Sequence, residues 1–214
     1  MIEIVRHIDP NEYTFEEAMK AGMAAHADGA HKIALNCRQI AFYNAQTPVE
    51  QARALRDGAA SLAYLDRLDE AGEAAETSVT MLEVEDAGGR ELAASYDRLA
   101  RVRTLTNMQA ERSGMHVFNP ARSYYDKALG LLELRDQYRT NMLSRVATAE
   151  ALYGTRSLAV VDSIRAAVGA LRSETRSKHL TAAGAALAVS LTVKSPHKDR
   201  SNTRSFALAK RLMH

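Results

Sequence analysis

The chain has 214 residues, enough for one domain with a buried core. Its 46% hydrophobic and 25% charged residues exclude an intrinsically disordered protein. Its formal net charge of +2 conceals an asymmetry. Residues 1–89 contain 16 acidic and 7 basic residues, whereas residues 90–214 contain 10 acidic and 21 basic residues. Opposed charge blocks of this kind favour either a self-complementary bundle or head-to-tail assembly of copies.

An all-α fold is predicted, because alanine is abundant, tryptophan is absent and only four prolines occur. We expect an elongated bundle of about five long Ala-rich helices over residues 14–194, acidic in 14–89 and basic in 90–194. A short extended N-terminal arm over residues 1–13 precedes the bundle, with isoleucines alternating with polar residues. A basic loop and a short terminal helix over residues 195–214 follow it.

The first two helices are predicted from their N-terminal signals. Thr14-Phe15-Glu16-Glu17 is a capping box that should begin a helix reaching about Gln46, with Asp28-Gly29 as a weak point. Thr47-Pro48-Val49-Glu50 repeats the signal and should begin a second helix that ends at Gly88-Gly89. The spacing of 33 residues between Thr14 and Thr47 suggests a tetratricopeptide repeat. We reject that interpretation, because the other signature residues do not recur and the predicted helices are about twice too long.

Three further helices are predicted in the basic part of the chain. The third reaches Ser113, and the fourth begins at Asn119-Pro120 and ends at Gly154. The fifth runs into the apolar stretch Leu180–Val193, whose 14 residues fall short of the roughly 20 that span a bilayer. This stretch is expected to be a buried helix, and membrane contact after a conformational change is the minority alternative.

No motif in the sequence indicates catalysis, a cofactor or a metal. His26 and His31 are five residues apart, so they would not share one face of a continuous helix. Phosphate-binding glycine loops and nucleophile elbows are missing from the sequence. The single cysteine, Cys37, excludes an intrachain disulfide framework and is expected to be a small buried hydrophobe. A non-enzymatic protein without cofactor is therefore predicted, made in the cytoplasm because no signal peptide opens the chain.

Charged residues supply the candidate interaction sites. The acidic candidates occupy consecutive turns of the second predicted helix and would contact a basic partner, including another copy of the chain: Asp66, Asp69, Glu70, Glu73 and Glu76. The basic candidates for the same interface lie on the third and fourth predicted helices: Arg98, Arg101, Arg103, Arg135 and Arg139. Arg135 and Arg139 are one helical turn apart and are expected to meet a common carboxylate or other anion.

The C-terminal part carries a second basic set that would contact an anion or nucleic acid: Lys194, Lys198, Arg200, Arg204, Lys210 and Arg211. Because no recognition motif accompanies these residues, only unspecific nucleic-acid contact is expected. An electrostatic helical protein that binds nucleic acid or an anionic membrane surface is accordingly the alternative function. The preferred hypothesis is a structural protein that forms homo-oligomers and binds other assembly proteins.

A short segment carries a family resemblance. The stretch Val161-Asp162-Ser163-Ile164-Arg165-Ala166-Ala167-Val168-Gly169 resembles a segment of the internal, ejection-type virion proteins of short-tailed bacteriophages, which are also helical and Ala-rich. The resemblance implies a multi-copy virion component near the genome or its exit path. A head–tail joining protein would meet the same physical demands.

Overall fold

A computed structural model describes residues 13–112, 121–133, 138–139, 142–143 and 146 of the chain. These residues form helices and no strand, which confirms the predicted all-α class. The helices with assigned bounds are α1 (Phe15–Ala27), α2 (His31–Asn44), α3 (Pro48–Tyr64), α4 (Leu68–Val84), α5 (Gly89–Arg112) and α6 (Ala121–Gly130). The predicted arm over 1–13 lies almost entirely outside the described residues, as do the fifth helix and the basic tail.

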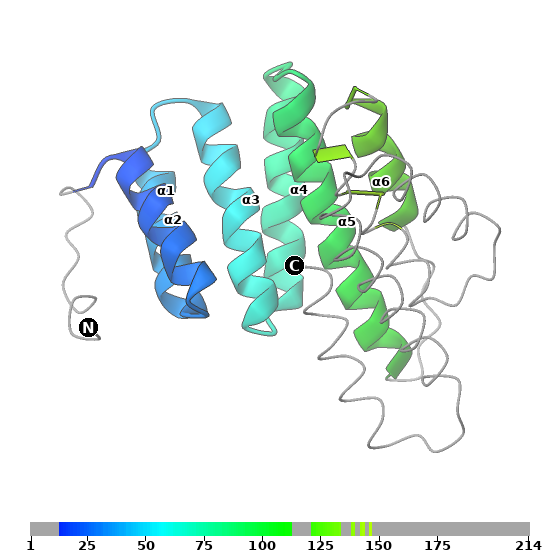
Figure 1. Cartoon of the computed structure of the whole chain (residues 1–214), viewed down its shortest axis with the longest axis horizontal. Helices are drawn as coiled ribbons and strands as arrows, with labels where there is room; N and C mark the ends of the chain where they lie inside the picture. The colour runs from blue at the N-terminus through cyan, green and yellow to red at the C-terminus, as the bar shows by residue number, and fades with distance from the viewer. Residues whose placement is uncertain (1–12, 113–120, 134–137, 140–141, 144–145, 147–214) are drawn as a thin grey trace, which may run out of the picture. The chain divides into compact units, whose positions relative to one another are not determined.

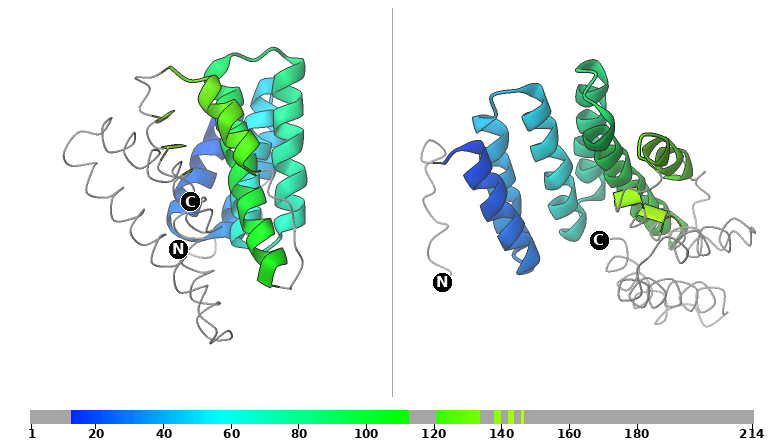
Figure 2. Two further views of the ribbon diagram at one scale, coloured as in Figure 1. Left: turned by 90° about the vertical axis from the view of Figure 1, so that its right-hand side faces the viewer. Right: turned by 45° about the horizontal axis from the view of Figure 1, so that its top comes forward.

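The chain divides into two compact units, residues 1–102 and residues 103–214. In the first unit, α1, α2, α3 and α4 follow one another side by side, and each runs antiparallel to the helix before it (Figures 1 and 2). The first two pairs are therefore helical hairpins, α1 with α2 and α3 with α4. The helix α2 also packs against α3, which joins the two hairpins.

Both predicted capping boxes are present. The Glu17 amide donates to Thr14 Oγ1 at 3.3 Å, and the Thr14 amide donates to Glu17 Oε2 at 2.9 Å. Thr47 and Glu50 make the same reciprocal pair, with distances of 3.2 and 3.3 Å. Each box satisfies amide groups that an α-helix leaves free at its first turn, so both hairpins begin where the sequence indicated.

The predicted lengths of the first two helices were wrong, because each of these helices is broken into two. The first break follows the weak point: Gly29 has φ +76°, and the Ala30 amide donates to Ala25 O at 2.8 Å. The second break lies at Asp66, with φ +62°, where the Arg67 amide donates to Leu62 O at 3.0 Å. Both are Schellman closures, in which one left-handed residue ends the helix and satisfies its last carbonyl groups.

A third Schellman closure ends α4. Asp86 has φ +46°, and the Ala87 amide donates to Leu82 O at 3.0 Å. The helices α1, α3 and α4 thus end by a Schellman closure, with glycine used once and aspartate twice, whereas α2 ends at Ala45 in extended backbone. These breaks remove the length objection to a helical-hairpin repeat, because each hairpin helix has 13 to 17 residues rather than twice that number.

Small side chains allow the helices of the first unit to pack closely. Fully buried alanines occur on α2, α3, α4 and α5: Ala34, Ala41, Ala52, Ala59, Ala63, Ala71, Ala75, Ala93 and Ala100. The hydroxyl of Ser78 on α4 donates to Ala52 O of α3 at 2.8 Å and lies 2.8 Å from the Ser95 hydroxyl of α5. The abundant alanines of the sequence therefore lie in the helix contacts, where their small side chains allow the helices to approach closely.

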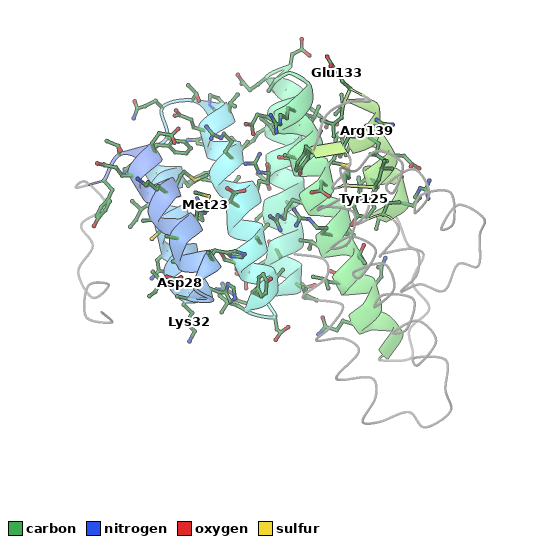
Figure 3. All side chains as sticks on the ribbon, viewed as in Figure 1. Met23, Asp28, Lys32, Tyr125, Glu133 and Arg139 are labelled. Carbon is green, nitrogen blue, oxygen red and sulfur yellow. The ribbon has the colours of Figure 1, made fainter. Side chains whose placement is uncertain are left out.

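The second unit contains the end of α5 and the helix α6. The predicted fourth helix is described from Ala121 as α6 and is interrupted after Gly130, where residues 131–133 are not helical. Helical backbone is found again at residues 138–139, 142–143 and 146. Tyr125 on α6 is only 1% exposed (Figure 3).

Candidate functional site

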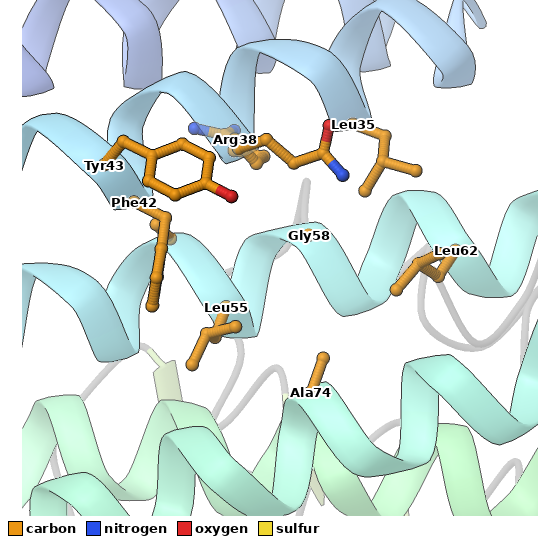
Figure 4. Close-up of a pocket in the computed structure, with 10 residues that line it drawn as sticks. Leu35, Arg38, Phe42, Tyr43, Leu55, Gly58, Leu62 and Ala74 are labelled. Atoms are coloured by element: carbon orange, nitrogen blue, oxygen red, sulfur yellow. The ribbon is translucent and has the colours of Figure 1, made fainter.

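An apolar groove lies on the first unit, between α2 and α4 and over α3 (Figure 4). Its volume is about 170 Å³. The residues that line it come from these three helices: Leu35, Arg38, Gln39, Phe42, Tyr43, Ala54, Leu55, Gly58, Leu62 and Ala74. Tyr43 stands at the groove with 78% of its surface exposed, while Phe42 is half-buried. An aromatic side chain exposed to this degree beside a hollow is typical of an interaction site.

Small residues create the hollow. Ala54 and Gly58 lie one turn apart on α3, and Ala74 faces them from α4 (Figure 4). A β-carbon placed on Gly58 would lie 3.7 Å from Arg38 Cβ and 3.9 Å from Leu35 Cδ1, which is ordinary contact distance. The groove is therefore open because three neighbouring positions carry little or no side chain, and α2 and α3 remain in normal contact beneath it.

Arg38 lines the groove but uses its charged end elsewhere. Its side chain is 7% exposed, and Nη1 donates to Met19 O at 2.6 Å. Its Nη2 lies 3.8 Å from Asp57 Oδ2. Burial lowers the pKa of Arg38, and the nearby Asp57 carboxylate opposes this effect. The groove thus receives the aliphatic part of Arg38, while the guanidinium ties α2 to α1 and α3.

An arginine–carboxylate network continues from Asp57 to α5. Arg56 Nε donates to Asp57 Oδ1 at 3.0 Å, and Arg56 Nη1 donates to Glu91 Oε2 at 2.6 Å. Burial by itself would raise the pKa of Asp57, but the guanidinium groups of Arg56 and Arg38 outweigh it and hold that pKa below its ordinary value of 3.8. The network connects α2, α3 and α5, and sequence reasoning missed it because its members are far apart along the chain.

His26 and His31 lie together, contrary to the sequence argument. The turn at Gly29 folds α2 back on α1, so their ring centroids are 4.9 Å apart and His31 stacks on Tyr64 at 4.1 Å. The prediction that these two histidines lie on different faces of one helix was therefore wrong. In the described part of the chain, no group of three or more His, Cys, Asp or Glu side chains is arranged to hold a metal ion.

This histidine cluster should make stability depend on pH. Burial, with the positive charge of His31 added, lowers the pKa of His26 from 6.5 to about 4. In the unfolded chain His26 is protonated near pH 6.5, whereas in the folded chain it is protonated only near pH 4. The free energy of unfolding therefore decreases as pH falls through this range. We expect the urea concentration at the midpoint of denaturation to decrease as the pH is lowered from 6.5 to 4. The decrease should be modest, because His26 is only half-buried. The variant His26→Gln should show a flatter midpoint over that range, and an equal slope in both proteins would contradict the assignment.

The acidic candidates from the sequence are placed on or beside α4. Asp66, Asp69, Glu70 and Glu73 are exposed and Glu76 is half-buried. Glu70 is paired with Arg67, whose Nε and Nη2 donate to it at 2.7 and 2.5 Å. Within the residues that the structure describes, no ion pair is found for Asp69 or Glu73. These two carboxylates are therefore the most accessible part of the predicted acidic interface.

The basic candidates are less accessible. Arg101 is 6% exposed and pairs with Asp97 one turn away at 3.1 Å, while Arg98 and Arg103 are half-buried. Arg139 donates from Nη1 to the carbonyl oxygens of Leu129 and Leu132. Arg101 and Arg139 thus serve contacts inside their own units. Arg135 and the second basic set, from Lys194 to Arg211, lie outside the described residues.

Two further expectations concern Cys37 and the membrane. Cys37 is 5% exposed and is a buried hydrophobe, as predicted, and burial raises the pKa of its thiol. Over the described residues, none of the helices combines the length and the apolar character needed to cross a bilayer. The apolar stretch 180–193 lies outside this region.

The fold and this site define a class of molecule, an all-α chain with stacked helical hairpins and an apolar groove. Comparison with known protein families, with curated proteins and with solved structures gives no match.

Proposed function

We propose that the chain is a non-enzymatic assembly protein that forms homo-oligomers, with the acidic face of α4 meeting the basic region of another copy. The observation that carries this proposal is the exposure of Asp69 and Glu73, which make no ion pair among the described residues. Charge on such a face steers association and selects the partner, while apolar contact supplies most of the free energy.

The distribution of arginine supports a partner from outside the first unit. Residues 1–89 have 16 acidic residues but only 7 basic ones, and several of the basic ones are already engaged. Arg38 and Arg56 bind the internal network, and Arg67 binds Glu70. The net negative charge of residues 1–89 can therefore attract the basic excess of residues 90–214, which a second copy can supply.

The resemblance at residues 161–169 extends the proposal. A multi-copy component of a bacteriophage virion, internal or at the head–tail junction, requires self-association and contact with other assembly proteins. The alternative function is unspecific binding of nucleic acid or an anionic membrane surface through Lys194, Lys198 and Arg200. The same alternative includes Arg204, Lys210 and Arg211, and it would appear as a monomer that shifts an oligonucleotide or binds anionic vesicles.

Charge reversal on α4 tests the proposal. The double variant Asp69→Lys and Glu73→Lys replaces attraction by repulsion, which costs several kcal/mol across an interface. Each 1.4 kcal/mol weakens association roughly tenfold, so we expect the native mass by light scattering to fall toward that of the monomer. Circular dichroism should show that helicity is retained.

A matched control uses two exposed acidic residues at the C-terminal caps of α1 and α4. The double variant Asp28→Lys and Glu85→Lys makes the same change in charge, and a cation near a helix C-terminus is well tolerated. Asp28 lies near Lys32, at the turn between α1 and α2 (Figure 3). Equal native masses for the two double variants would show that the acidic face of α4 does not mediate self-association.

A further inference from the structure

The α2–α3–α4 groove has the size of a side-chain site rather than a metabolite site. Its volume of about 170 Å³ is below the roughly 300–1,000 Å³ of typical small-molecule pockets. Its polar lining residues are Arg38, Gln39 and Tyr43, and the Arg38 guanidinium is held by Met19 and Asp57. A groove with so few oriented polar groups suits one or two large apolar side chains from a protein segment.

We infer that this groove receives residues 204–214 of a second copy of the chain. The inference rests on the proposed self-association and adds the place and the segment that perform it. The sequence of this segment is Arg-Ser-Phe-Ala-Leu-Ala-Lys-Arg-Leu-Met-His, which is predicted to form the terminal helix.

The segment has the pattern of a groove-binding helix. At 100° per residue, its large apolar side chains fall within one arc of about 160°: Phe206, Leu208, Leu212 and Met213. Phe206 and Met213 are seven residues apart, a spacing that places both on one side of a helix. Amphipathic helices bind apolar grooves through anchors at these spacings.

Charge favours the same occupant. On α4, Glu73 precedes the lining residue Ala74, and Glu70 lies one turn before it. Both glutamates are exposed, and Asp69 adds a third carboxylate on the same turn. The segment supplies cations at Arg204, Lys210 and Arg211, outside its apolar arc. Apolar side chains in the groove and cations beside α4 are therefore compatible in one docked helix.

Disulfide trapping between two full-length copies tests the inference. In a Cys37→Ala background, one copy carries Tyr43→Cys at the groove, and a differently tagged copy carries Ser205→Cys beside Phe206. Under a mild oxidant, we expect a covalent dimer that contains both tags. The matched control replaces Tyr43→Cys by Met23→Cys, since Met23 is 64% exposed on α1 and does not line the groove (Figure 3). Its yield should be several-fold lower.

A further variant and the native mass separate the possible failures. Adding Phe206→Ser to the Ser205→Cys copy should lower the yield with Tyr43→Cys, because the apolar anchor is lost. Oligomers that cross-link equally through Met23→Cys and Tyr43→Cys would overturn the groove assignment and leave self-association intact. Monomers at every salt concentration would overturn both. In a chain that carries both Tyr43→Cys and Ser205→Cys, a disulfide within the chain and no dimer containing both tags would show that the segment comes from the same chain. That result would exclude the second copy as its source.

Discussion

Replacing Asp57 with asparagine is expected to lower the free energy of unfolding by about 3 kcal/mol. Removing one partner of a buried ion pair costs about 3–5 kcal/mol, because the other charge stays buried without compensation. The lower end applies here, since Asp57 is 26% exposed and Arg56 keeps its contact with Glu91. The measurement is urea denaturation of both proteins followed by circular dichroism, with Asp69→Asn on the exposed face of α4 as the near-neutral control.

The pH dependence of the same variant checks the cause. The neighbouring arginines hold the pKa of Asp57 below 3.8, so its contribution is complete above that pH and is lost as pH falls through the lower, folded-state value. Asp57→Asn should remove this part of the acid dependence. If the stability difference between the two proteins persisted unchanged at the lowest pH, the loss would come from packing rather than charge.

Replacing Gly22 with alanine is expected to destabilise the first unit by about 1–3 kcal/mol, as overpacking does in a closely packed interior. An added β-carbon would lie 3.0 Å from Arg38 Nε and 3.1 Å from Cys37 Cβ. The second neighbour is the first atom of a buried side chain, so it is unable to move without a shift of α2. The displaced Arg38 would also lose its short bond to Met19 O. Thermal unfolding of the variant measures the effect.

Gly58→Ala is the matched control, because Gly58 is also a buried glycine within a helix. Its added β-carbon would meet neighbours at 3.7 and 3.9 Å, which requires no movement. Alanine should therefore stabilise α3 by roughly 0.5–1 kcal/mol through its better helix propensity. Equal effects of the two substitutions would show that α1 and α2 are farther apart than the structure places them.

Local signals explain which parts of the fold were predictable. Thr14 and Thr47 begin helices because a capping box acts over four residues and depends little on the rest of the chain. The break at Gly29 was foreseen as a weak point, since glycine accepts a positive φ without strain. The break at Asp66 was missed, because aspartate adopts this conformation much less often than glycine and the apolar period continues across it. The end of α4 at Asp86 lies shortly before the predicted end at Gly88-Gly89.

The candidate site was predictable only in its exposed part. The acidic residues of α4 recur every one to three positions on consecutive turns, and Asp69 and Glu73 are exposed as this spacing suggests. The groove depends on residues from three helices, so the spacing of Ala54 and Gly58 was its one local signal. The exposure of the basic residues was the least predictable, because an arginine can lie on the surface or in a buried ion-pair network. Arg101 is buried in such a network.

The native mass of the unmodified chain at two salt concentrations tests the central claim, self-association through complementary charge. At about 0.05 M salt, we expect a mass well above the 23.5 kDa of one chain. Near 1 M salt, where the Debye length is about 3 Å, the attraction is screened and the mass should fall toward 23.5 kDa. A mass of 23.5 kDa at both salt concentrations would contradict the account and favour the electrostatic binding of another anionic partner.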